Sequence, residues 1–174
     1  NNKPIHFIGL VSDGGVHSHI NHLKGLLSMG FARGFKNMFV HAFTDGRDCD
    51  PKSGLGFITE LENHMAATAG KVASVIGRYY AMDRDKRWER VKLAYDLLVN
   101  GQGEKSTSAQ ISIQQSYLAD VTDEFLQPIC ITENNEPLAK ISEGDVVICF
   151  NFRTDRGREI TEALTQKAFP EQNM

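Results

Sequence analysis

Four short segments of the chain gather histidine, aspartate and arginine in patterns that suit the binding of an anion. They are residues 12–19, 44–50, 77–85 and 150–156. Five of the nine arginines lie in these segments, whereas none of the ten lysines does. A planar guanidinium binds carboxylate or phosphate through two parallel hydrogen bonds and is more weakly hydrated than ammonium. The pattern predicts a site for a small, multiply charged anion, and we expect that ligand to balance the charge of the arginines.

Each of these residues alone also has an ordinary structural explanation. Asp50, Asp83 and Asp85 could be helix N-caps, and Arg84 belongs to an i, i+3, i+6 row that would simply face solvent. Arg78 is harder to explain in this way, because it directly follows an apolar run, where an unpaired cation is costly. The coincidence of four such segments favours a binding site.

Three histidines near the first segment raise the question of a metal ion. His17 and His19 are spaced as metal ligands often are, and His22 follows three residues later. No cysteine or glutamate accompanies them, so the pattern does not favour a metal site within the chain. His17 instead follows a glycine turn near the start of a predicted helix, where backbone N–H groups attract anions. We therefore expect His17 to donate to a phosphate group.

Apolar runs alternate with stretches of helical spacing and indicate an α/β fold. Buried strands are predicted over 5–11, 38–43, 72–76 and 146–152, a short strand over 128–132, and helices over 20–31, 50–65, 85–100, 108–119 and 157–168. This alternation predicts three layers, with a mostly parallel central sheet and helices on both faces. The polar segments follow four of the strands. They should meet at the carboxyl rim of the sheet, where open α/β folds bind ligands.

Capping residues predict where two of the helices begin. Asp50 is expected to be the N-cap of the second helix, with Pro51 as its first residue. The third helix is expected to run from about Asp85 to Asn100, with Gly101 just beyond its end.

The composition is that of an ordinary globular protein of 174 residues. Hydrophobic residues make up 41%, charged residues 24%, and the net charge is −3, which argues against a disordered chain and against a nucleic-acid partner. Cys49, Cys130 and Cys149 are too widely spaced for a disulfide framework and indicate reduced thiols in a cytoplasmic protein. No apolar run approaches the roughly 18 residues of a membrane span. We expect a single domain over 1–174, with no membrane partner.

Four motifs together resemble the cofactor-independent phosphoglycerate mutase family, whose members do not require 2,3-bisphosphoglycerate. They are Ser12-Asp13-Gly14-Gly15-Val16-His17-Ser18-His19, Thr44-Asp45-Gly46-Arg47-Asp48, Gly77-Arg78-Tyr79-Tyr80-Ala81-Met82-Asp83-Arg84-Asp85 and Phe150-Asn151-Phe152-Arg153-Thr154-Asp155-Arg156. The motifs stand in the family's order and span nearly the whole chain. The family combines a phosphatase-like domain, which carries a serine nucleophile and two manganese ions, with an inserted phosphotransferase domain. The chain resembles the inserted domain alone, and a start without methionine fits a piece of a larger protein.

The resemblance implies a role in glycolysis and gluconeogenesis. Family members are isomerases that interconvert 3-phosphoglycerate and 2-phosphoglycerate through a phosphoserine, and the inserted domain binds and reorients the glycerate. The residues implied to contact phosphoglycerate are His17, Arg47, Asp48, Arg78, Arg84, Arg153 and Arg156. Asp48 would accept the proton of the attacking hydroxyl, and Arg153 would neutralise charge on the transferring phosphoryl group.

The resemblance also implies what this chain does not contain. Both Mn²⁺ ions would be bound outside it, on the phosphatase-like domain of the same polypeptide, and no cofactor is expected on this domain. The chain alone is therefore expected to fold but to lack mutase activity.

Two other functions remain open on the residues alone. A stand-alone metal-dependent phosphohydrolase or transferase could use His17, His19 and Asp48, and tightly bound metal would distinguish it. A non-catalytic anion-binding module is the other alternative, and it would lack coding sequence on both sides of this segment.

Overall fold

The centre of the molecule is a seven-stranded sheet. The computed structural model describes residues 3–166 and 169–174. The strand order is β4-β5-β3-β2-β1-β7, with β6 paired to β5. The strands are β1 (Ile5–Leu10), β2 (Met38–Thr44), β3 (Lys71–Gly77), β4 (Glu104–Ser106), β5 (Ile129–Glu133), β6 (Glu136–Pro137) and β7 (Val146–Cys149). Strands β3, β2, β1 and β7 are mutually parallel, whereas β5 runs antiparallel to β3.

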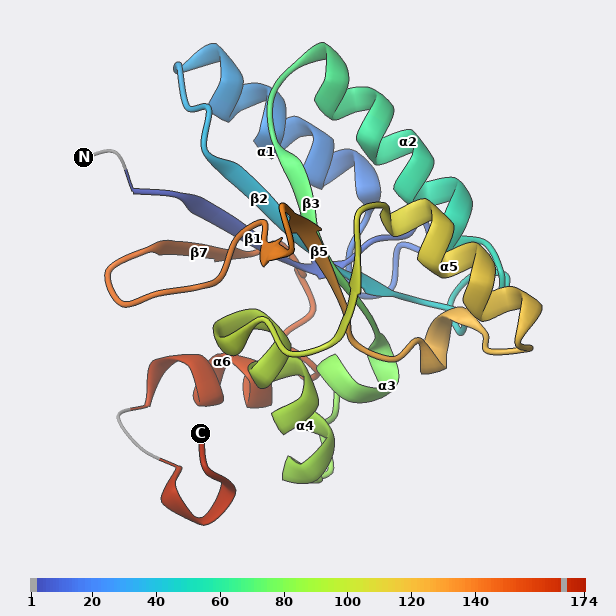
Figure 1. The fold of residues 1–174 in the computed structure, drawn as a ribbon, viewed down its shortest axis with the longest axis vertical. Helices are drawn as coiled ribbons and strands as arrows, with labels where there is room; N and C mark the ends of the chain where they lie inside the picture. The colour runs from blue at the N-terminus through green and yellow to red at the C-terminus, as the bar shows by residue number, and fades with distance from the viewer. Residues whose placement is uncertain (1–2, 167–168) are drawn as a thin grey trace.

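Helices cover both faces of this sheet (Figure 1). One face carries α1 (Ile20–Ala32), α2 (Gly54–Ala67) and α5 (Ala109–Leu118), and the other carries α3 (Arg78–Ala81), α4 (Trp88–Tyr95), the π-helical turn η1 (Asp96–Asn100) and α6 (Arg158–Thr165). Short 3-10 turns, η2 (Asp123–Phe125) and η3 (Pro170–Gln172), lie in the connections. The predicted three-layer, mostly parallel α/β fold is confirmed. Within the described residues, no helix is both long enough and apolar enough to cross a membrane.

Two hydrophobic cores lie on opposite faces of the sheet. Phe7 packs in the core beneath α1 and α2, and its neighbour Ile8 packs in the core beneath α4 and α6. Side chains alternate between faces along a strand, so a strand covered on both faces is mostly apolar. This requirement explains the composition of β1, β2 and β3, whose buried polar side chains, His6, His41 and Ser74, bond to one another.

The second helix begins later than its capping pattern predicts. Asp50 is not the N-cap: its side chain accepts from the backbone N–H of Lys52 at 2.9 Å and closes a turn. The helix starts at Gly54, whose N–H donates to Asp123 Oδ2 at 2.7 Å. A carboxylate distant in sequence therefore satisfies the helix N-terminus, and Pro51 lies in the preceding turn.

The third predicted helix is divided. Asp83 Oδ2 accepts from the N–H groups of Asp85 and Arg87 at 3.0 and 2.9 Å, so the segment before Trp88 is held as a turn. The chain is then α-helical to Tyr95 and continues as η1 to Asn100. Gly101 follows in the left-handed conformation that glycine favours, as predicted.

The last strand and the last helix are both shorter than predicted. Strand β7 ends at Cys149, and it lies at the edge of the sheet with Val146 and Val147 48% and 36% exposed, not buried. Helix α6 ends at Thr165. Residues 167–168 of the predicted helix lie outside the described residues.

Candidate functional site

The carboxyl ends of β1, β2, β3 and β7 meet at one edge of the sheet, because these four strands are parallel. The loops that follow them carry the four polar segments. Five of the seven predicted residues form one connected group of short contacts there: His17, Asp48, Arg78, Arg84 and Arg153. We call this group, together with Asp45 and Asp155, the rim cluster.

Arg78 is the buried centre of the rim cluster. Its side chain is only 4% exposed, and its Nη1 atom donates to Asp45 Oδ1 at 2.7 Å and to Asp48 Oδ2 at 2.6 Å. Burial alone would lower the pKa of Arg78, but the hydrogen bonds to Asp48 and Asp45 outweigh it and raise the pKa. The guanidinium is therefore permanently charged, and two carboxylates balance it.

Local backbone geometry delivers Arg78 to this position. Strand β3 ends at Gly77, whose N–H donates to the Leu126 carbonyl at 2.8 Å. A Cβ at Gly77 would collide with the backbone of Glu124 and Leu126, so only glycine permits this close approach. The chain then turns directly into α3, and the first residue of that short helix is the arginine.

Asp45 organises the loop after β2. Its Oδ1 accepts from the N–H groups of Arg47 and Asp48 at 3.1 and 3.0 Å, and its Oδ2 accepts from the Ser12 hydroxyl at 2.6 Å. Burial alone would raise the pKa of Asp45. The Asp48 N–H, the Ser12 hydroxyl and Arg78 together lower it below its usual value. One ionised carboxylate thus fixes both the backbone of Asp48 and the guanidinium that holds its side chain.

His17 lies beneath the same group and is 3% exposed. Its Nε2 atom is 3.9 Å from Asp48 Oδ2, and its Nδ1 atom is 3.8 Å from Asp155 Oδ1. Burial lowers its pKa, and the nearby Arg78 adds to that effect. The imidazole is therefore neutral at physiological pH. The backbone carbonyl of His17 accepts from the N–H of Arg153 at 3.3 Å and so anchors the fourth polar segment.

Asp155 joins two of the exposed arginines. Arg153 approaches it through two nitrogens, with Nε 2.9 Å from Oδ1 and Nη2 3.0 Å from Oδ2, and Arg84 Nη1 is 3.2 Å from Oδ2. Nη2 of Arg153 and Nη1 of Arg84 donate hydrogen bonds to Oδ2, whereas Oδ1 accepts no hydrogen bond and takes part only in the ion pair with Nε. The side chains of Arg153 and Arg84 are 46% and 47% exposed, so a soluble anion can reach them.

The remaining two predicted residues lie at the margin of the rim cluster. Arg156 is half-buried and donates to the Met82 carbonyl at 3.1 Å. Burial lowers its pKa, as do the charges of Arg84 and Arg78. Arg47 points outward and pairs with Glu124 at 3.2 Å. All seven residues were predicted to lie in polar segments, but Asp45 and Asp155 were given no role. For Asp45, its position directly after β2 was the available signal; Asp155 lies in the fourth polar segment, beyond the end of β7.

The described residues do not form a metal site. No group of three or more histidine, cysteine, aspartate or glutamate side chains is placed in them to hold an ion. His19 has a structural function instead: its Nδ1 atom accepts from the Asn21 N–H at 3.2 Å and caps α1. The rim cluster itself offers guanidinium and imidazole donors that can bind an anion.

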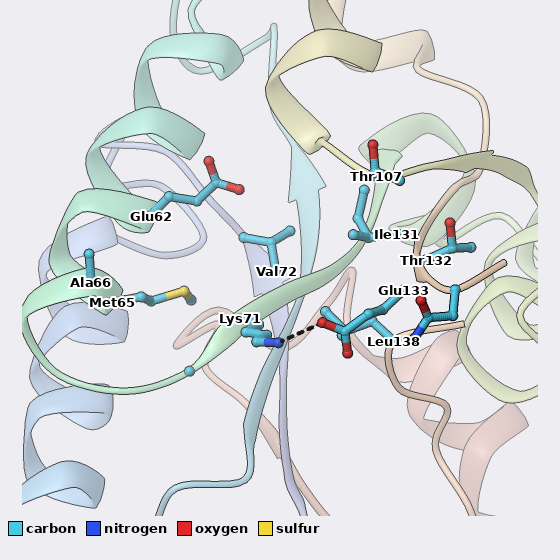
Figure 2. A pocket seen from close by; sticks show the side chains of 12 residues that line it. Glu62, Met65, Ala66, Lys71, Val72, Thr107, Ile131, Thr132, Glu133 and Leu138 are labelled. Carbon is cyan, nitrogen blue, oxygen red and sulfur yellow. Dashed lines mark ion pairs between the residues drawn. The ribbon is translucent and has the colours of Figure 1, made fainter. Parts of the chain in front are cut away.

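A separate hollow lies at the other end of the sheet (Figure 2). It has a volume of about 550 Å³ and lies between α2 and strands β3 and β5. An ion pair between Lys71 and Glu133, 3.5 Å apart, crosses it. Lys71 is the first residue of β3, so this hollow is at the amino end of the strand and contains none of the seven predicted residues.

Comparisons with known proteins agree with the motif resemblance. The family model described as "BPG-independent PGAM N-terminus" matches residues 1–174. Among curated relatives, the 2,3-bisphosphoglycerate-independent phosphoglycerate mutase of Flavobacterium psychrophilum is 65% identical over 100% of this chain and 35% of its own length. That of Clostridium perfringens is 55% identical over 97% of this chain and 33% of its own.

A solved structure supports the same relation. A crystal structure of Leishmania mexicana phosphoglycerate mutase, determined at low cobalt concentration, superimposes with a TM-score of 0.92 and 36% identity. It matches 96% of this chain and 32% of its own. The chain thus spans about a third of the length of the relatives that it matches.

Proposed function

The chain belongs to the 2,3-bisphosphoglycerate-independent phosphoglycerate mutase family, and on that premise we propose that it is the part of such an enzyme that binds and reorients glycerate. The intact enzyme would interconvert 3-phosphoglycerate and 2-phosphoglycerate through a phosphoserine on the remainder of the polypeptide. We further propose a cytoplasmic place in glycolysis and gluconeogenesis.

The observation that carries this proposal is the paired geometry of Arg78 and Asp48. A buried guanidinium holds Oδ2 of Asp48 at 2.6 Å, and two exposed arginines, Arg84 and Arg153, pair with Asp155 in the same cluster. Phosphoglycerate carries a carboxylate, a phosphate and a hydroxyl, so it needs cationic donors beside one acceptor for a proton. The rim cluster supplies both kinds of group within a few ångströms.

In the proposed cycle, the serine oxygen gives up its proton and attacks phosphorus, and the bond to the C3 oxygen of 3-phosphoglycerate breaks as that oxygen gains a proton to become the C3 hydroxyl of glycerate. The bound glycerate then turns, and its C2 hydroxyl oxygen attacks the phosphoserine phosphorus while the serine oxygen leaves. The hydroxyl proton passes to Asp48, whose Oδ1 atom is the one that does not bind Arg78. Arg153 stabilises charge on the transferring phosphoryl group.

The other predicted residues orient the substrate. His17 is neutral because burial lowers its pKa, so one ring N–H can donate to the ligand. Arg84 and Arg156 lie beside Arg153 and Asp155, where they can hold carboxylate or phosphate, and Arg47 closes the outer margin. A substrate anion would take over the guanidinium donors that Asp155 now occupies.

The two manganese ions that the resemblance implies do not fit the described residues of this chain, which contain no suitable ligand group. In line with the family resemblance, we assign the metal ligands and the nucleophile to a phosphatase-like domain of the same polypeptide. No step assigned here to Asp48, Arg153 or His17 depends on metal ligation by this chain.

The proposal is tested in the intact enzyme by replacing Arg153 with alanine. Loss of a charge-stabilising donor should lower kcat/KM by roughly 100-fold or more, while the melting temperature stays close to that of the parent because the side chain is half exposed. Arg33→Ala is the matched control: it removes an exposed arginine at the end of α1, outside the rim cluster. Equal kcat/KM in both variants would contradict the assignment.

A further inference from the structure

Glu159 is a buried acidic residue in the first turn of α6, and none of the proposed steps uses it. The residue is only 7% exposed. Its Oε1 atom accepts from the backbone N–H of Lys86 at 2.9 Å, whereas its Oε2 atom is buried and accepts from no donor among the described residues. A buried carboxylate without a full set of donors is costly, so an ionised Glu159 would be unfavourable in this position.

The carboxyl group of Asp83 is the partner of Glu159. Asp83 is also buried, with 5% exposure, and the two side chains form a hydrogen bond with each other. A hydrogen bond between two carboxyl groups requires one proton, because two carboxylates in contact cannot both be ionised at little cost. The geometry therefore indicates that Asp83 and Glu159 share a proton.

Asp83 has enough donors to remain the ionised member of the pair. Its Oδ2 atom accepts from the N–H groups of Asp85 and Arg87 at 3.0 and 2.9 Å, and its Oδ1 atom is 3.6 Å from Arg90 Nη1 on α4. Burial alone would raise the pKa of Asp83. The two N–H groups, the bond from Glu159 and the charge of Arg90 together lower it.

The surroundings of Glu159 favour its protonated form. Burial raises the pKa of Glu159, and Asp83 and Asp85 raise it further, whereas the N–H of Lys86 opposes them only in part. Glu159 also lines a hollow of about 530 Å³, through which its proton can exchange with solvent. The other charged side chains that line this hollow are Arg84, Lys86, Asp155, Arg158 and Glu162.

The two carboxyl groups tie a loop of the rim to α6. Together they accept from three successive backbone N–H groups, those of residues 85–87. Lys86 lies in the middle of this loop with a φ of 57°, in the left-handed region that residues other than glycine rarely adopt. The loop begins with Arg84, directly after Asp83. The position of Arg84 thus depends on the bond between Asp83 and Glu159.

We propose that Glu159 is a positioning residue for Arg84: it donates its proton to Asp83, and this bond holds Arg84 beside Asp155 for the bound anion. The inference rests on the proposed function, because it assigns Arg84 to substrate binding. Loss of the proton would put two carboxylates in contact and release the loop. KM for phosphoglycerate should then rise with pH, while kcat stays nearly unchanged, since Glu159 touches no reacting group.

The shared proton is tested on the chain itself by carbon NMR of its carboxyl groups. The resonance that disappears in Glu159→Gln belongs to Glu159, and its pKa should lie above the ordinary value of 4.5. A pKa at or below that value would overturn the inference. This measurement needs no activity, so it can fail separately from the proposed function.

The positioning of Arg84 is tested by KM for 3-phosphoglycerate in the intact enzyme, over a pH range that spans the titration of Glu159. Glu159→Gln keeps a donor for Asp83 and an acceptor for the Lys86 N–H but does not titrate. Its KM should therefore stay low at high pH, where that of the parent rises by roughly tenfold, the effect expected from one lost charge-assisted hydrogen bond. Glu159→Ala should show the higher KM at every pH.

Glu162→Gln is the matched control. It neutralises a carboxyl that lines the same hollow but accepts from Gln166 at 3.2 Å, so its pH profile should follow that of the parent. Equal KM profiles for the parent and Glu159→Gln would contradict the inference, whether or not Glu159→Ala folds. A lower kcat with unchanged KM in Glu159→Ala would also contradict it. Arg153→Ala tests the proposed function separately: if that variant keeps the parent kcat/KM, the proposed function fails, and the NMR titration still decides whether the proton is shared.

Discussion

Asp45 is expected to contribute more to stability than any other carboxylate of the rim cluster. Four donors surround it: the Ser12 hydroxyl, the N–H groups of Arg47 and Asp48, and Arg78. Asp45→Asn keeps the shape of the side chain but removes its charge, and it places an NH₂ group against donors. Arg78, buried with 4% exposure, then keeps only one charged partner.

The size of the effect follows from that geometry. Removing one partner of a buried ion pair costs about 3–5 kcal/mol. Asp48 still pairs with Arg78 at 2.6 Å, so we expect the lower end, about 3 kcal/mol. For a domain of this size, this corresponds to a fall in melting temperature of about 6–12 °C.

The assay is chemical and thermal unfolding of the chain, followed by circular dichroism at pH 7. Asp50→Asn is the control: that side chain is exposed and closes only a local turn with Lys52, so its change should stay within about 1 kcal/mol. The pH dependence gives a second check. Because the pKa of Asp45 is lowered in the folded state, its stabilisation is complete above the unfolded value of 3.8 and is lost as pH falls through the folded pKa.

As the pH falls below 3.8, the free energy of unfolding should therefore decrease less for Asp45→Asn than for the parent. The reasoning would be refuted if the free energy of unfolding of Asp45→Asn at pH 7 were within 1 kcal/mol of that of the parent. It would mean that Asp48 alone can neutralise the buried guanidinium.

Three further expectations concern His41, Gly77 and turnover by the chain alone. Burial, reinforced by His6, lowers the pKa of His41 to about 3, so the unfolding free energy should fall by roughly 1.4 kcal/mol per pH unit as pH drops from 6.5 toward 3; denaturant titrations should show a flatter slope for His41→Asn. Gly77→Ala should destabilise the chain by about 1–3 kcal/mol because its Cβ meets the Glu124 backbone, whereas Gly25→Ala, with open space around it, should be neutral or stabilising in thermal melts. A coupled assay of the purified chain should detect no mutase turnover, since the nucleophile is assigned to the rest of the polypeptide.

The strands that the sequence predicts best are those buried on both faces. The runs at 5–11, 38–43 and 72–76 coincide with β1, β2 and β3 within one or two residues, because a doubly covered strand is mostly apolar. Helix starts were harder to predict. The group that satisfies the N-terminus of α2 is Asp123, 69 residues away from Gly54, and no local pattern around Asp50 reveals it.

The apolar pattern correctly predicts the last strand, but the prediction that this strand is buried was wrong. The apolar run at 146–152 predicts an interior strand, yet β7 is exposed among the described residues. Periodicity reports the environment for which the residues are suited, whereas β7 pairs only with β1 among the described residues.

For the rim cluster, the sequence predicted which segments carry its residues but not which carboxylate pairs with which guanidinium. Segments that follow parallel strands converge at one edge of the sheet, so the sequence alone groups His17, Asp48 and Arg78. Which carboxylate would hold which guanidinium depends on side-chain directions that only the tertiary structure fixes. The catalytic and binding roles of these residues remain predictions to be tested in the intact enzyme.

The charge balance at the rim differs from the sequence expectation in an instructive way. The ligand was expected to neutralise the arginines, yet aspartates already do so: Arg78 is paired with Asp45 and Asp48, and Arg153 with Asp155. An anion that binds Arg153 or Arg84 would then exchange with Asp155. Asp45 is buried together with Arg78 and cannot be displaced by a ligand, whereas Asp155 pairs with exposed arginines and can be displaced. We therefore expect an anionic ligand to bind at Arg153 and Arg84, while the ion pair of Arg78 with Asp45 stays in place and holds Asp48 in position.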